Sequence, residues 1–260
     1  VLATVIALLA VFHAVNAREQ QATNTADADR YRGWPAYGGG PEQIRYSSLK
    51  QIDKNNVKQL EIAWTFDSGE TGGLQTNPIV VNGTVYTTTP THKVVALDAA
   101  TGAKRWTFES GIEGRGPNRG VTYWSSGNDA SLFTGQGSYV YSLDPKTGKP
   151  QPKFGKDGRI DLRDGLERDA AAQSIALTTP GVIYKDLLIV GGRVSEGFPS
   201  LPGDVRAYDV RTGAQKWVFH TIPHPGEAGY DTWPADAWKT AGGANNWAGM
   251  SVDVQRGVIY

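Results

Sequence analysis

The fold of this 260-residue chain is decided by a turn between two β-type runs, Ala96-Leu97-Asp98-Ala99-Ala100-Thr101-Gly102-Ala103-Lys104-Arg105-Trp106. Asp and Thr side chains bond backbone amides in such turns, and glycine supplies the positive φ that closes them. The run on either side has the apolar or alternating character of a strand. We therefore predict strands over 93–98 and 104–108, with Trp106 free to dock on a neighbouring unit.

The same pattern occurs twice more along the chain. It returns in residues 142–148 as Ser142-Leu143-Asp144 with Thr147-Gly148, and in residues 207–217 as Ala207-Tyr208-Asp209 with Thr212-Gly213 and Trp217. Upstream, the pair Asn82-Gly83 between two β-type runs is a strong hairpin signal. Repeats of this size are typical of four-stranded propeller blades.

These repeats predict an all-β fold, a partial β-propeller with about three to four blades present. A β-sandwich is the structural alternative. It would explain the hairpins, but it gives no reason for the repeated Asp-x-x-Thr-Gly-x-x-x-Trp pattern.

Composition excludes several classes of function. Lys plus Arg and Asp plus Glu both number 26, so the zero net charge gives no basis for nucleic-acid binding. Because the chain has no cysteine, disulfides, zinc–thiolate sites and thiol nucleophiles are excluded. The scattered histidines, including His92, His220 and His224, are predicted to be solvated loop side chains rather than metal ligands.

The first residues indicate export. An apolar run over 1–12 is followed by small residues up to Ala17, a pattern typical of the h-region and cleavage site of a signal peptide. The end of a membrane anchor is the alternative for 1–17. Residues 18–30 are polar and predict a linker before a propeller domain over 31–260. Either alternative places the domain in the periplasm, with possible association with the inner membrane.

Three segments carry residues that do not suit a strand or an ordinary turn. Arg119 lies among Gly and polar residues in 118–124, where a guanidinium could meet a carboxylate. Glu196 follows a buried-type strand and two glycines, where a carboxylate could ligate calcium. Trp247 lies among small residues, which would leave a ring face open for a flat cofactor. A surface Arg, a solvated Glu and a core Trp are the structural alternatives.

With these segments in view, the chain resembles the pyrroloquinoline quinone (PQQ)-dependent alcohol and sugar dehydrogenases over residues 34–260. The resemblance also rests on the stretches Trp34-Pro35-Ala36-Tyr37-Gly38-Gly39, Arg45-Tyr46-Ser47 and Leu60-Glu61-Ile62-Ala63-Trp64. The resemblance implies an eight-bladed propeller of which this chain is an N-terminal fragment.

The resemblance also implies roles for individual residues. Trp247 would form the floor under PQQ, and Arg119 would pair with a PQQ carboxylate. Thr178 would contact the cofactor, with Thr179 as the register alternative. Gln75 falls where many relatives have a cofactor-binding Glu, so hydrogen bonding is retained there and a charge is lost.

For the metal, the resemblance implies calcium with Glu196 as a ligand. It implies that the catalytic Asp and a further calcium ligand lie beyond residue 260, so no catalytic residue is named. Methanol-type members stack PQQ beneath adjacent cysteines, and Glu113-Gly114 stands there instead. Together with residues 232–238, this favours the glucose-dehydrogenase-like branch.

The implied activity is PQQ- and calcium-dependent oxidation of a sugar or alcohol hydroxyl, with electrons passed to a respiratory quinone or a cytochrome. A non-enzymatic propeller acting as a binding or assembly scaffold is the alternative, because repeat architecture does not fix function.

Overall fold

The computed structural model describes residues 32–114, 116–166, 168 and 173–260. The predicted signal or anchor segment (1–17) and linker (18–30) lie outside them. Within the described part of the chain, no helix is long or apolar enough to cross a membrane.

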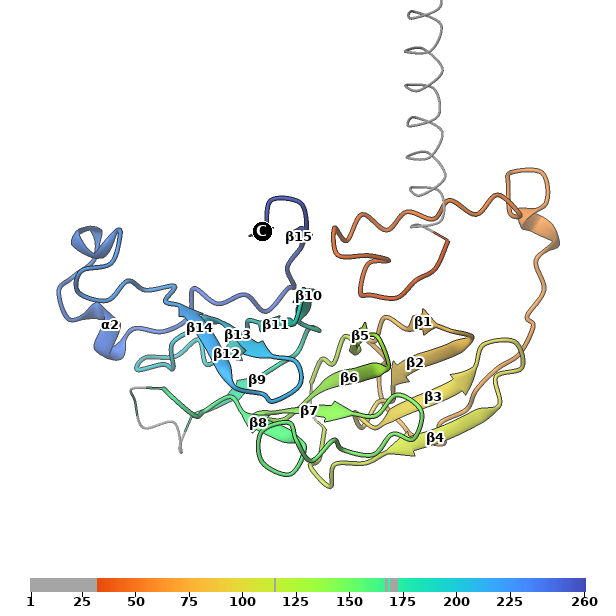
Figure 1. Ribbon diagram of the computed structural model, residues 1–260, viewed down its shortest axis with the longest axis horizontal. Helices are drawn as coiled ribbons and strands as arrows, with labels where there is room; N and C mark the ends of the chain where they lie inside the picture. Colours follow the sequence, from red (N-terminus) through yellow and green to blue (C-terminus); the bar gives the residue numbers. More distant parts are fainter. Residues whose placement is uncertain (1–31, 115, 167, 169–172) are drawn as a thin grey trace, which may run out of the picture.

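Three four-stranded antiparallel sheets follow one another along the chain, each with its strands in sequence order from one edge to the other (Figure 1). The first contains β1 (Ile79–Val81), β2 (Thr84–Thr88), β3 (Val94–Asp98) and β4 (Lys104–Phe108). The second contains β5 (Thr122–Ser126), β6 (Asp129–Gln136), β7 (Tyr139–Leu143) and β8 (Arg159–Asp161). The third contains β10 (Val182–Tyr184), β11 (Leu187–Val190), β13 (Val205–Asp209) and β14 (Gln215–Phe219).

Short elements complete the described chain. They are the pair β9 (Ile175–Ala176) and β12 (Arg193–Val194), the hairpin β15 (Val252–Asp253) and β16 (Val258–Ile259), the 3₁₀ turns η1 (Val57–Gln59) and η2 (Tyr230–Thr232), and helix α2 (Ala237–Thr240). Three complete sheets and one further hairpin match the three to four blades expected from the repeats.

The predicted turns form as the residue types require. Asn82 and Gly83 both have positive φ, 48° and 68°, which gives the β1–β2 hairpin the twist of its strands. In the repeated turn, the Asp98 carboxylate accepts hydrogen bonds from the backbone amides of Ala100 and Thr101. Asp144 and Asp209 do the same in the second and third sheets.

The core lies between neighbouring sheets rather than inside any one of them. One buried cluster joins the first and second sheets through residues such as Ile79, Val94 and Leu132. A second joins the second and third sheets through Phe133, Leu188 and Tyr208. A sheet with both faces buried against its neighbours is the packing expected of propeller blades and not of a two-sheet sandwich.

A tryptophan of the first sheet docks on the repeated turn of the second sheet. Trp106 on β4 donates its indole N–H to the carbonyl of Pro145, 3.0 Å away in the next sheet, and its ring lies against Gly148. At the next joint Ile160 on β8 takes the place of the tryptophan and contacts Gly213. The second sheet thus replaces an aromatic ring with a branched aliphatic side chain at the same joint.

The segment over residues 60–66, before the first sheet, resembles the outer strand β4 in its sequence and in the docking of its tryptophan. Its sequence Trp64-Thr65-Phe66 repeats the Trp106-Thr107-Phe108 of β4. Trp64 docks in the same manner, with its indole N–H on the carbonyl of Ala99 at 3.2 Å and its ring against Gly102. Yet residues 60–66 pair with no strand of the described chain, and Ile62 is 82% exposed.

Candidate cofactor site

The loops that lead into the three sheets are hydrogen-bonded to one another around Arg119. The backbone amide of Asn77, just before β1, donates to the carbonyl of Arg119 at 3.0 Å. The amide of Arg119, before β5, donates to the carbonyl of Thr178 at 3.0 Å. Gly120 has φ of +124°, and a Cβ there would lie 2.8 Å from the Asn77 carbonyl, so glycine is required for this close approach.

Three of the predicted residues, Arg119, Thr178 and Trp247, lie close together at these backbone hydrogen bonds. The Arg119 guanidinium lies over the Trp247 ring, 5.3 Å from its centroid, and donates to the Thr179 hydroxyl at 3.4 Å. Thr179 in turn donates to the carbonyl of Trp247 at 2.5 Å. Thr178 is only 5% exposed, and its hydroxyl has no hydrogen-bond partner among the described residues.

The loop before Trp247 is fixed against the two glycines that follow β11. Asn246 accepts the amide of Gly192 at 3.0 Å, and the Asn245 side chain donates to the Gly192 carbonyl at 2.6 Å. A Cβ on Gly191 would lie 2.2 Å from the Asn246 carbonyl, so a side chain there would push this loop away. Trp247 itself is 49% exposed, so part of this aromatic side chain is accessible to a ligand.

Two predicted residues lie apart from this group. Gln75 is exposed in the segment before β1, and Glu196 is exposed in the loop after β12. Neither forms a hydrogen bond or an ion pair with Arg119 or Trp247. Across the described residues, no three His, Asp or Glu side chains lie close enough to hold a metal ion together.

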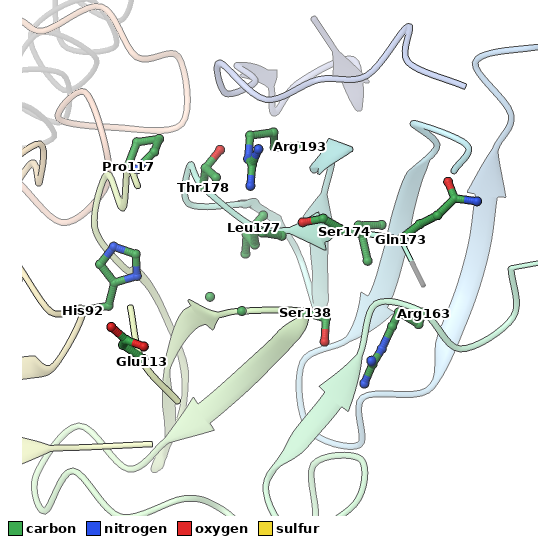
Figure 2. A pocket seen from close by; sticks show the side chains of 14 residues that line it. His92, Glu113, Pro117, Ser138, Arg163, Gln173, Ser174, Leu177, Thr178 and Arg193 are labelled. Atoms are coloured by element: carbon green, nitrogen blue, oxygen red, sulfur yellow. The ribbon is translucent and has the colours of Figure 1, made fainter. Parts of the chain in front are cut away.

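A cavity of about 310 Å³ opens beside Thr178 (Figure 2). It is lined by His92, Glu113, Pro117, Gly135, Gly137, Ser138, Arg163, Gln173, Ser174, Ile175, Ala176, Leu177, Thr178 and Arg193. Two of these side chains are guanidinium groups, and none is Trp, Tyr or Phe. Of these residues, only Thr178 belongs to the site predicted from the sequence.

The two arginines of the cavity, Arg163 and Arg193, differ in whether a carboxylate of the described chain pairs with them. Arg163 pairs with Asp161, whose carboxylate receives its Nε and Nη2 at 2.9 and 2.6 Å. Burial acts to raise the pKa of Asp161, but the hydrogen bonds and charge of Arg163 outweigh it and hold that pKa below its usual value. No acidic side chain of the described chain pairs with Arg193.

The prediction that the histidines are solvated is wrong for His92. It is 7% exposed, its Nε2 lies 2.9 Å from the Gly116 carbonyl, and its own carbonyl accepts the Gln136 side-chain amide. A Cβ on Gly114 would lie 2.5 Å from the His92 ring, so residue 114 must be glycine. A buried His with a backbone partner is structural, which a single sequence could not distinguish from a loop His.

The fold and this group define a class: a β-propeller that presents an arginine, a half-exposed tryptophan and a buried hydroxyl where its inner loops converge. Residues 34–260 match the family described as "PQQ: Glucose/ethanol/alcohol dehydrogenase, beta-propeller domain". The chain therefore belongs to the PQQ-dependent dehydrogenase propeller family.

Individual relatives agree with this assignment. The dehydrogenase subunit of the alcohol dehydrogenase (quinone) of Gluconobacter oxydans (strain 621H) is 31% identical over 93% of this chain and 34% of its own length. Quinoprotein glucose dehydrogenase A of Acinetobacter calcoaceticus is 28% identical over 87% of this chain and 32% of its own. The crystal structure of quinohemoprotein alcohol dehydrogenase from Comamonas testosteroni superposes with a TM-score of 0.73 at 27% identity, over 89% of this chain and 35% of that one.

The chain thus spans about a third of the length of these relatives. Glucose and alcohol dehydrogenases match it at similar identity, so the predicted closeness to the glucose branch stays a prediction.

Proposed function

We propose that this chain is part of a PQQ-dependent dehydrogenase that oxidises a sugar or alcohol hydroxyl. The observation that carries the proposal is the convergence of Arg119, Trp247 and Thr178 at the meeting point of three loops, in a chain of this family. When bound, PQQ would accept the two electrons of the oxidation.

The residues of this group fit a flat, anionic cofactor. The half-exposed Trp247 ring provides a surface for stacking, and Arg119 next to it provides a fork for a carboxylate. The buried Thr178 hydroxyl, which has no partner in the described chain, would hydrogen-bond the same ligand. Thr179 already bonds both Arg119 and Trp247, so we assign it to positioning and Thr178 to contact.

Calcium belongs to the proposal with Glu196 as its ligand. An exposed carboxylate after a strand is the donor type that calcium prefers, but it is a single carboxylate here. Gln75 keeps its place as a cofactor-binding candidate because it lies two residues before Asn77, which bonds Arg119. The general base is not assigned to any residue of this chain.

The setting of the reaction is also part of the proposal. Relatives named as quinone-dependent and quinohemoprotein dehydrogenases support a quinone or cytochrome as the electron acceptor. The apolar run over residues 1–12 supports export to the periplasm and association with the inner membrane.

The test is PQQ titration of the apoprotein expressed from its full reading frame, followed by tryptophan fluorescence with and without calcium. Dye-linked oxidation of glucose and ethanol is then measured in the same preparation. We expect saturable PQQ binding that Trp247→Ala abolishes and calcium dependence that Glu196→Ala removes. The matched control is Trp233→Ala, which deletes another exposed indole outside this group.

A folded protein that neither binds PQQ nor oxidises either substrate would overturn the proposal. The propeller would then be better described as a binding or assembly scaffold.

A further inference from the structure

The loop that carries Trp247 has a second attachment, which follows the tryptophan in the sequence. The carbonyl of Met250 accepts a hydrogen bond from the side-chain amide of Gln43, a residue 207 positions earlier in the chain. Met250 is 4% exposed and packs in a buried cluster with strands of the third sheet. Gln43 belongs to the segment over residues 34–45, at the start of the described chain, so this bond joins two distant parts of the sequence.

Residues 34–45 connect this loop to the first sheet. The amide of Val80 on β1 donates to the carbonyl of Trp34 at 2.8 Å. The amide of Val252 on β15 donates to the carbonyl of Pro41 at 2.9 Å. The segment accordingly lies next to β15 (Figure 1). It supports the Trp247 loop from the side opposite to the third sheet.

Gln43 has a backbone conformation that few residues other than glycine adopt. Its φ is +54°. The turn around it closes where the amide of Arg45 donates to the carbonyl of Gly38 at 2.9 Å, and a Cβ on Gly38 would lie 2.9 Å from the Cβ of Gln43. A left-handed residue of this kind persists where the surrounding structure holds it. The turn therefore fixes the direction in which the Gln43 side chain points.

Gly249 shows how closely the loop is enclosed. It has φ of +107°, and a Cβ there would lie 3.0 Å from Cγ2 of Thr179 and 3.8 Å from the side-chain nitrogen of Gln43. On the first of these sides, the Thr179 hydroxyl bonds the carbonyl of Trp247. On the second, the Gln43 amide bonds the carbonyl of Met250. Two side chains from different parts of the chain thus hold the backbone on either side of Gly249.

We propose that Gln43 is a positioning residue for Trp247. By holding the carbonyl of Met250, it fixes the backbone of the loop and, through it, the indole ring beside Arg119. The inference rests on the proposed function, in which that ring receives a flat cofactor. A side chain that is ordered before the ligand arrives loses less conformational freedom on binding, so the ligand binds more tightly.

The first experiment measures the position of the ring without any ligand. The protein from its full reading frame is labelled with fluorinated tryptophan, and the fluorine NMR resonance of Trp247 is assigned with Trp247→Phe. Gln43→Met keeps an unbranched side chain of similar length and removes its donor. We expect it to shift or broaden the Trp247 resonance and to leave that of Trp106, at the joint of the first two sheets, unchanged. A general loss of stability would not single out one ring.

Further variants separate positioning from folding. Gln43→Lys has an unbranched side chain that ends in an N–H donor, so its Trp247 resonance should stay close to that of the wild type. Gln255→Met is the matched control, because it alters an exposed glutamine between β15 and β16 and should change nothing. Thermal melting checks each fold. Gln43→Glu, which also lacks the donor when ionised, repeats the test if Gln43→Met does not fold.

An unchanged Trp247 resonance in Gln43→Met, or an equal shift in Gln255→Met, would overturn the proposal.

The second experiment is a PQQ titration of the same proteins. Gln43→Met should weaken PQQ binding about fivefold, the loss expected when one hydrogen bond no longer holds the loop. A shifted Trp247 resonance with unchanged PQQ affinity would overturn the positioning role. Failure of the wild-type protein to bind PQQ would count against the proposed function alone, because the fluorine resonances are measured without ligand.

Discussion

The ring of Trp106 lies directly against Gly148 of the next sheet, so closely that a Cβ on Gly148 would come within 2.5 Å of it. Gly148 also has φ of +70°, which disfavours any other residue. We expect Gly148→Ala to lower the free energy of unfolding by about 3 kcal/mol, from backbone strain plus overpacking. Urea unfolding followed by tryptophan fluorescence measures it.

The matched control is Gly127→Ala, at a turn with φ of +59° and open space around the added Cβ. This variant should show the backbone cost alone, about 1 kcal/mol. Equal losses at the two positions would mean that the contact with Trp106 contributes nothing to the joint.

The repeated turn at Asp98 should make the stability of the fold depend on pH. The ion pair with Arg105, followed by hydrogen bonds from Thr101 and Ala100, lowers the pKa of Asp98 from 3.8 to about 2. A lowered pKa means that the stability is fully present above the ordinary value and is lost as the pH falls toward about 2. We expect Asp98→Asn to flatten the fall in melting temperature between pH 5 and pH 2.

The comparison variant for that experiment is Asp231→Asn, which removes an exposed carboxylate from the 3₁₀ turn η2. Acid sensitivity reduced to the same extent in both variants would show that the turn and its Arg105 pair have no special part in it.

Thr178 and Thr179 should respond differently to loss of the hydroxyl. Thr178→Val removes a hydroxyl that has no partner in the described chain, so PQQ affinity should fall about fivefold. The fluorescence of the unliganded protein should not change. Thr179→Val removes the link between Arg119 and Trp247, so the fluorescence of the unliganded protein should change as well. The reverse pattern would make Thr179 the contact residue.

The extended segment 60–66 should exchange its amide hydrogens quickly in a chain of these 260 residues. It has no strand partner in the described chain, whereas β3 lies between two neighbours in its sheet. Hydrogen–deuterium exchange should show peptides over 60–66 exchanging well before peptides over β3. Similar protection of the two would indicate a strand partner for 60–66.

The strands of the sheets could be predicted because the residues that specify their turns lie next to one another in the sequence. The Asn82-Gly83 hairpin and the turn at Asp98 are each written within a few residues, and the structure confirms both. The docking of Trp106 was also predicted, although its acceptor Pro145 could not be identified without coordinates. Ile160 at the next joint has no such signal, because any branched side chain can fill that space.

In the candidate site, the sequence singled out residues only where the residue type was unusual for its segment, and their roles in binding a cofactor stay predictions. Arg119 and Trp247 were of this kind, and the structure places them in contact. The positioning role of Thr179 arises from contacts across almost 70 residues, which a single sequence does not reveal. Arg193 escaped notice for a related reason: its place in the cavity depends on the pairing of β12 with β9.

The peptide unit of Arg119 is hydrogen-bonded on one side to the loop before the first sheet and on the other to the loop before the third. A ligand held by Arg119 would therefore add its binding free energy to the seam between three sheets at once. Any ligand that binds there should raise the melting temperature of the whole array. Arg119 would thus link ligand binding to the stability of the three sheets whose entry loops meet at its peptide unit.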